Sequence, residues 1–159
     1  MASTYTTNIR LTKQGDGDNP NTWGEILNDV ISLVDQAVGS YTTITVGATS
    51  SVALTNNQGS ADQARSAVLE IAGTVGGTHT SIFVYLPAGA SKTYAIKNAV
   101  SANTTATDAV VLRVAGQTHG VTVPSGGVGY FFTNGTSVNT LNAAGFSAIT
   151  TTQADARYV

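Results

Sequence analysis

The sequence predicts a mainly β protein: an antiparallel β-sandwich or jelly-roll-like module, preceded by an extended N-terminal arm and one amphipathic α-helix. Short apolar segments recur from Tyr41 onward, and glycine, proline or asparagine separates most of them. Only one segment before them has helical periodicity. The 159 residues fit one such module with small additions, and the 42% of hydrophobic residues are enough to form a core.

Residues 1–21 form the predicted arm. Tyr5, Ile9 and Leu11 share one parity in an alternating segment, which predicts a short strand with one apolar face. Residues 14–21 are almost all turn formers and separate this segment from the rest of the chain. We therefore expect the arm to pair with another protein rather than with its own domain.

Residues 22–39 form the predicted helix. Thr22 and Glu25 have the spacing of a capping box, and Gly39 is placed to end the helix just beyond its last turn. The apolar positions are three or four residues apart and form a wide stripe: Trp23, Ile26, Leu27, Val30, Ile31, Val34, Ala37 and Val38. This stripe is wide enough to pack on its own domain and also against helices of other copies.

Nine strands are predicted within the module that spans residues 40–142. Their ranges are 41–46, 51–55, 67–72, 80–86, 93–98, 109–115, 120–123, 128–133 and 137–141. Asn134-Gly135 between two of them is the strongest hairpin signal. No helix is predicted between these strands, which favours antiparallel pairing. Residues 143–159, rich in alanine, threonine and serine, are predicted to be a C-terminal tail or linker.

The sequence offers little for catalysis. It has no cysteine, and its two histidines, His79 and His119, have no second ligand at metal-binding spacing. No nucleophile motif and no phosphate-binding glycine loop is present. We expect no catalytic, cofactor or metal-binding residues, and we expect that the protein is not an enzyme.

The charge and the aromatic residues indicate which partners to expect. A net charge of −2 argues against a basic nucleic-acid surface, and no apolar run is long enough to span a membrane. Only 10% of residues are charged, which favours close contact with other copies because little charge must be desolvated. Tyr130, in a predicted strand, is either a packing residue or a stacking platform for a glycan.

Two groups of segments resemble known virion proteins. Residues 1–8, the glycine-rich turns after them, and a helix that opens with Asn21-Thr22-Trp23-Gly24 and ends in Asp35-Gln36-Ala37 resemble the N-terminal region of bacteriophage tail-fibre and related virion proteins. Strand and turn segments at 69–73, 86–87, 94–98, 121–124 and 134–138 resemble small fibre modules of that group, and residues 152–158 resemble the linker after such modules.

This resemblance implies a phage virion structural protein, a homotrimeric tail fibre or fibre anchor attached to the particle through its N-terminal arm. Tyr5, Ile9 and Leu11 would dock the arm. The residues expected to pack the three helices together are Trp23, Leu27, Val30 and Val34. The implied partners are further copies and other virion proteins (tail, portal-adaptor or capsid), with no nucleic acid and no membrane insertion, and a host surface receptor is a further candidate.

The implied location is the particle surface, at the tail rather than the head. Two alternatives remain open at this point. One is a capsid decoration, cement or head-fibre protein. The other is a glycan-binding module that uses Tyr130.

Overall fold

A computed structural model of the chain describes residues 2–47, 51–74, 81–101 and 109–141. The helical elements are α1 (Trp23–Gly39) and the short 3-10 helix η1 (Gln63–Arg65). The strands are β1 (Thr4–Tyr5), β2 (Thr12–Lys13), β3 (Tyr41–Thr45), β4 (Ser51–Ala53), β5 (Val68–Thr74), β6 (Ser81–Leu86), β7 (Ser91–Ser101), β8 (Ala109–Val114), β9 (Gly120–Val123), β10 (Val128–Asn134) and β11 (Val138–Thr140). The prediction of a mainly β protein with one long helix is confirmed, and the predicted tail at 143–159 lies outside the described residues.

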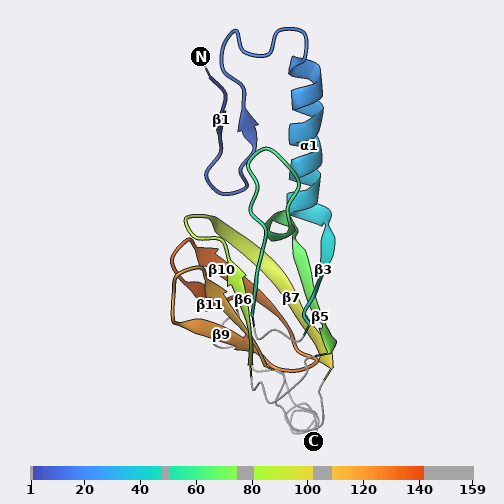
Figure 1. Ribbon diagram of the computed structural model, residues 1–159, viewed down its shortest axis with the longest axis vertical. Coiled ribbons are helices and arrows are strands. Elements are labelled where there is room, and N and C mark those ends of the chain that lie inside the picture. The colour runs from blue at the N-terminus through green and yellow to red at the C-terminus, as the bar shows by residue number, and fades with distance from the viewer. Residues whose placement is uncertain (1, 48–50, 75–80, 102–108, 142–159) are drawn as a thin grey trace, which may run out of the picture.

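Two sheets enclose one hydrophobic core. The five-stranded sheet has the order β11-β10-β7-β5-β3 and the four-stranded sheet the order β4-β6-β8-β9. Side chains from both sheets form the core, among them Ile71 and Ile96 from the first and Val84 and Leu112 from the second. The module therefore has the two-layer arrangement of a β-sandwich (Figure 1).

The prediction of antiparallel pairing is wrong for the strands from β3 to β8. The chain alternates between the sheets from β3 to β8, so neighbours within a sheet run parallel: β3 with β5, β5 with β7, β4 with β6, and β6 with β8. Parallel strands need a long crossover, and here a strand of the opposite sheet supplies it. The last three strands pair antiparallel: β9 with β8, and β10 with both β7 and β11.

The predicted strand positions and inward faces are confirmed. All nine predicted strands are present, with ends that differ by a few residues. Leu69 and Ile71 are fully buried, whereas Glu70 between them is not. The Asn134-Gly135 hairpin joins β10 to β11, and Gly135 has the positive φ of 90° that such a turn requires. The Asn134 side chain accepts hydrogen bonds from the backbone N–H groups of Thr136 and Ser137.

The helix is present as predicted, but its ends are built differently. The Thr22 hydroxyl donates to the carbonyl of Asn19 and makes no hydrogen bond to the helix, so the expected capping box is wrong. Gly39 is the last helical residue, without a positive φ, and Ser40 ends the helix instead. The Ser40 N–H and hydroxyl both donate to the carbonyl of Gln36, which stabilises the last turn.

We expect Gly73→Ala to destabilise the fold by about 2–3 kcal/mol. Gly73 has a φ of 125°, and a Cβ there would lie 2.1 Å from the backbone carbonyl oxygen of Val46. Denaturant unfolding of the variant measures this loss. Gly89→Ala is the control, because Gly89 also has a positive φ but open space around it, and it should lose only about 1–2 kcal/mol. Equal losses for both variants would contradict the close approach of Gly73 to Val46.

Candidate interaction surface

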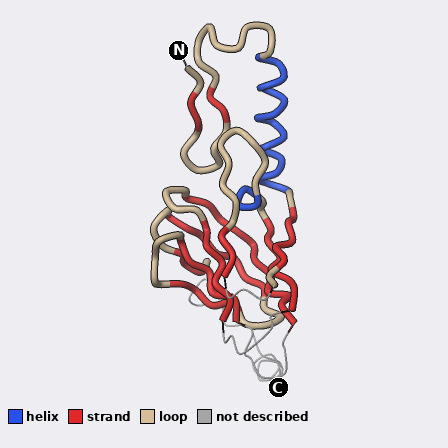
Figure 2. The backbone as a smooth tube through the Cα atoms, in the orientation of Figure 1, coloured by secondary structure: helices blue, strands red, loops and turns tan. Residues whose placement is uncertain are grey.

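The helix and the N-terminal hairpin form a stalk at one end of the β module. Strands β1 and β2 pair antiparallel, and they lie beside α1 beyond the end of the sheets (Figures 1 and 2). One stripe of α1 faces the chain itself: Leu33 is buried, and Ile26, Val30 and Ala37 are half-buried. The Gln36 side chain also donates to the carbonyl of Asp62, 2.9 Å away. These contacts fix α1 to the segment that precedes β5.

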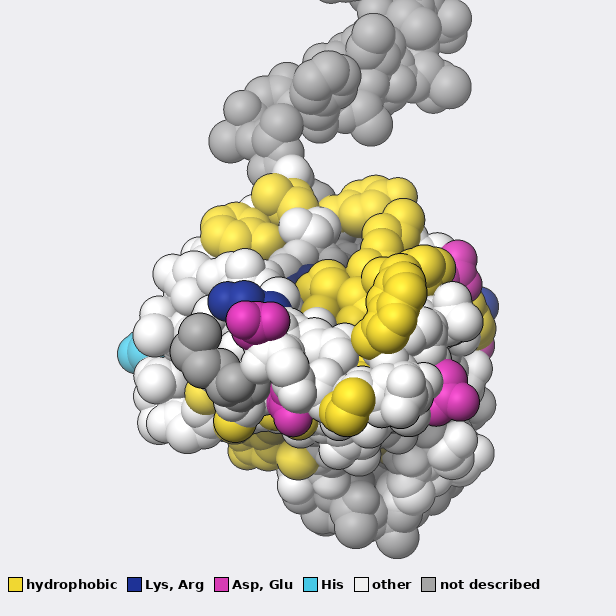
Figure 3. All heavy atoms as spheres, turned by 90° about the horizontal axis from the view of Figure 1, so that it is seen from above, with side chains coloured by type: hydrophobic (Ala, Val, Ile, Leu, Met, Phe, Trp, Pro, Cys, Tyr) yellow, Lys and Arg dark blue, Asp and Glu magenta, His cyan; other side chains and the backbone are white. Residues whose placement is uncertain are grey.

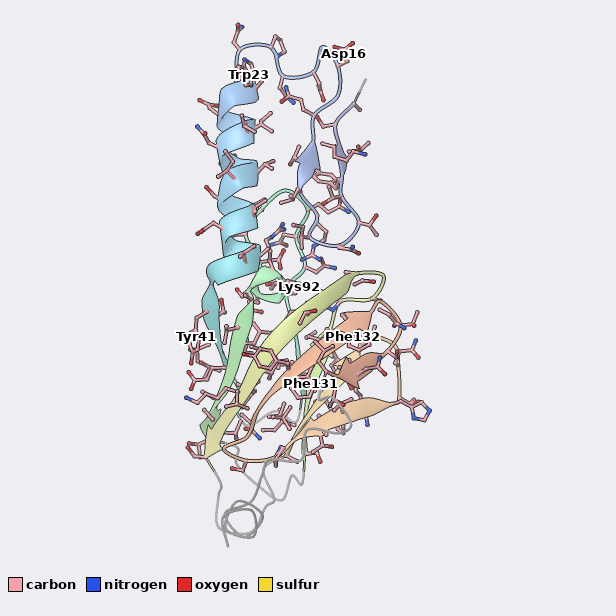
Figure 4. The ribbon with its side chains drawn as sticks, turned by 180° about the vertical axis from the view of Figure 1, so that it is seen from behind. Asp16, Trp23, Tyr41, Lys92, Phe131 and Phe132 are labelled. Atoms are coloured by element: carbon pink, nitrogen blue, oxygen red, sulfur yellow. The ribbon has the colours of Figure 1, made fainter. Side chains whose placement is uncertain are left out.

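A second apolar stripe on α1 is exposed. Its residues are between 39% and 77% exposed: Trp23, Leu27, Ile31, Val34 and Val38. From Leu27 to Val38 the steps are four, three and four residues, which is the a/d spacing of a coiled-coil seam. We call these five residues the helix seam. Figure 4 shows Trp23 at the free end of the stalk and Tyr41 where the helix meets the sheet.

The four helix-packing residues that the sequence predicts do not all lie on the same stripe of α1. Trp23, Leu27 and Val34 belong to the helix seam, whereas Val30 lies on the half-buried inner stripe. Ile31 and Val38 complete the seam and were not among the predicted packing residues. The structure describes a single chain, so the packing of the four predicted residues in a trimer stays a prediction.

The seam continues onto the outer face of the five-stranded sheet. Tyr41 lies three residues after Val38 and is 54% exposed. The strand register aligns Tyr41 with Val68, Val68 with Ala95, and Ala95 with Tyr130. The N–H of Leu141 donates to the carbonyl of Tyr130, so Leu141 extends the same row. We call these five residues the sheet row. Viewed from above, hydrophobic side chains gather on one side of the molecule (Figure 3).

The predicted single strand through Tyr5, Ile9 and Leu11 is wrong. Thr4 and Tyr5 form β1, residues 7–9 turn, and the chain returns as β2. Arg10, at the end of this turn, has a φ of 55°, which an extended strand does not allow. Tyr5 is exposed, whereas Ile9 and Leu11 are half-buried. The arm is folded against its own chain, and whether it docks on another protein stays a prediction.

A buried ion cluster holds the arm in place. Both oxygens of the Asp62 carboxylate accept from the Arg10 guanidinium, at 3.0 and 2.9 Å, and one also accepts from Arg65 at 2.9 Å. The Asp62 and Arg65 side chains are fully buried. Arg65 also donates to the carbonyls of Ile9, Asn57 and Ser60. No local pattern predicts this cluster, because Arg10 and Asp62 lie 52 residues apart in the chain.

Lys92 lies next to this cluster, where the arm meets the module (Figure 4). Its amine donates to the carbonyl of Ser66 at 2.7 Å and lies 4.2 Å from the ring centre of Tyr94. Burial lowers the pKa of Lys92 to about 8; Asp62 opposes this shift, and the nearby Arg10 and Arg65 add to it. The folded chain therefore releases this proton at lower pH than the unfolded chain does.

We expect the free energy of unfolding to rise with pH between about 8 and 10 through Lys92. In this range the unfolded state binds more protons at this amine than the folded state, so raising the pH favours folding. Denaturant unfolding at several pH values should show a smaller rise for Lys92→Met than for the unchanged chain. Lys13→Met, at an exposed position, is the control and should keep the original slope. A slope that Lys92→Met leaves unchanged would contradict the low pKa.

The other residues singled out in the sequence lie on the module. Tyr130 is 62% exposed, so the expectation that it packs in the core is wrong. Phe131 beside it is buried, which confirms the expected alternation of this strand. His119 is exposed in the turn before β9, and His79 lies outside the described residues.

No three His, Asp or Glu side chains come together as a metal-binding group among the described residues. In the described part of the chain, no helix has the length and apolar character needed to cross a membrane.

Comparison with models of protein families, with curated proteins and with solved structures found no match to the chain. The functional conclusion therefore depends on the exposed surfaces of the stalk and the sheet and on the resemblance of sequence segments to phage fibre proteins.

Proposed function

We propose that the protein is a bacteriophage virion structural protein, a homotrimer that forms a tail fibre or fibre anchor and attaches to the particle through its N-terminal stalk. The helix seam is the observation that supports this most strongly. Five large apolar side chains in a row are unusual on the surface of a protein that works alone. Association of three helices would remove them from water.

The residue types in the seam favour three helices over two. In the heptad register, Ile31 and Val38 occupy a positions and Val34 the d position between them. Isoleucine at both a and d positions shifts the preference from two helices to three or four, whereas β-branched a with leucine d favours dimers, and valine is β-branched like isoleucine. Leu27 is the one leucine in this register, at the end farther from the module. The charged residues of α1 are all acidic, so its contacts between copies are apolar and not ion pairs.

The stalk is the part of the protein suited to meet the particle. The free end of α1 and the hairpin lie together, away from the sheets (Figure 1). Between the arm and the β6–β7 turn lies a groove of about 310 Å³, lined by Tyr5, Arg10 and Ala90 among others. In this proposal, a segment of a neighbouring virion protein occupies the groove and contacts both the arm and the module.

Labelling of purified phage particles tests the location. Antibodies to this protein, imaged by electron microscopy, should mark the tail, with a few trimers per particle. Many copies distributed over the head would instead identify a capsid decoration or head-fibre protein. Particles that carry no label, although the protein is expressed during infection, would contradict a role in the virion.

A further inference from the structure

We infer that the sheet row is a second contact between copies of this chain, continuous with the helix seam. The inference rests on the proposed oligomer and extends its interface from the stalk onto the β module. The row consists of one residue from each of β3, β5, β7 and β10, together with the residue that directly follows β11: Tyr41, Val68, Ala95, Tyr130 and Leu141. It crosses the whole width of the sheet.

Continuity with the seam identifies the occupant as another copy. Tyr41 follows Val38 at the three-residue step of the heptad and is also the first member of the sheet row. A helix from a second copy that packs along the seam therefore brings its own module close to Tyr41. In this arrangement, copies related by one symmetry axis bury the seam and the sheet row together, from Tyr41 across to Tyr130.

The charges of this face permit such a contact. Among the described strands, the outer face of the five-stranded sheet carries two charged residues, Glu70 and Lys97, and they form an ion pair at 2.7 Å. The hydroxyls of Tyr41 and Thr43 also donate to Glu70. A second copy could therefore cover this face without leaving a buried charge unpaired, which would cost more than burying the ion pair.

The surroundings of Tyr130 favour a protein partner over a glycan. Its neighbours on this face are Val128 and Phe132 along β10, Ala95 on β7 and Leu141 at the end of β11. Glycan sites combine a stacking ring with several hydrogen-bonding groups, and these four nearest neighbours supply none from their side chains. Of the polar residues diagonal to Tyr130 on β7, Thr93 and Lys97, the lysine is already paired with Glu70. An apolar row of this kind matches the apolar centre of a protein interface.

Cysteine labelling tests the inference directly, because the natural chain has no cysteine. Tyr130→Cys should react with a maleimide at least tenfold more slowly in the oligomer than in a dissociated form, made by adding Leu27→Asp and Val34→Asp. Thr122→Cys is the matched control, because Thr122 is exposed on the outer face of the other sheet. It should react equally fast in both forms, and circular dichroism checks that each variant is folded.

Each outcome has one interpretation. An oligomer in which Tyr130→Cys reacts as fast as in the dissociated form overturns the sheet contact and leaves the helix contact standing. Slow labelling in both forms also overturns it, because a segment of the same chain would then cover Tyr130. Fast labelling together with glycan binding that Tyr130→Ala abolishes would identify a glycan site. A wild-type chain that is monomeric overturns both this inference and the proposed trimer.

Discussion

Leu27→Asp combined with Val34→Asp is expected to convert the proposed trimer into single chains of 16.2 kDa. Both side chains lie in the exposed helix seam, at d positions one heptad apart. In a trimer each substitution would bring three carboxylates together at an apolar axis, where removing each from water costs several kcal/mol. Light scattering after size-exclusion chromatography measures the mass, which should fall about threefold.

The control for this variant is Ser32→Asp. Ser32 is exposed on the same helix but outside the seam, so the added charge should leave the mass unchanged. Because Leu27 and Val34 are exposed in the single chain, the double variant should retain the far-ultraviolet spectrum of the folded protein. An unchanged mass for the double variant would show that the seam does not join the copies.

Asp62→Asn is expected to destabilise the folded chain by about 3–5 kcal/mol, since it leaves two buried guanidinium groups without a negative partner. For a chain of this size the melting temperature should fall by roughly 6–20 °C. The asparagine has nearly the same shape as the aspartate, so the loss measures charge and the hydrogen bonds of one lost acceptor oxygen, and not packing. Thermal unfolding provides the measurement, and Asp29→Asn, at an exposed position of α1, should change the melting temperature by less than about 2 °C.

The effect of Asp62→Asn should extend to the arm. Arg10 connects the N-terminal hairpin to Asp62, so the weakened cluster should let trypsin cleave after Arg10 or Lys13 sooner than in the unchanged chain. Adding Arg10→Met to Asp62→Asn should recover part of the lost stability, because it removes one of the two unpaired charges. A double variant less stable than the sum of the two single changes would contradict the proposed pairing.

Most strands were predictable because they are apolar at alternate positions and are followed by a turn former. Tyr94 and Ile96, for example, are buried between the less buried Lys97 and Thr93, as their period of two requires. The pairing direction was not predictable. Alternation shows which side chains face the core, but it does not show which sheet a strand joins, so the crossovers between the sheets left no local signal.

The candidate surface was predictable only in part. The spacing of Leu27, Val34 and Val38 showed a stripe, but the sequence alone did not show that α1 has two stripes and that Val30 lies on the inner one. The sheet row depends on register between strands far apart in the chain, such as that of Val68 with Ala95. The folded arm depends on the pairing of Arg10 with Asp62, which the sequence separates widely.

The mass of the unmodified chain in solution tests the central claim most directly. Sedimentation equilibrium over a range of protein concentrations should give three times the 16.2 kDa of one chain. A mass of 16.2 kDa that stays constant up to millimolar concentration would contradict the account, because the helix seam would then remain exposed in the working protein.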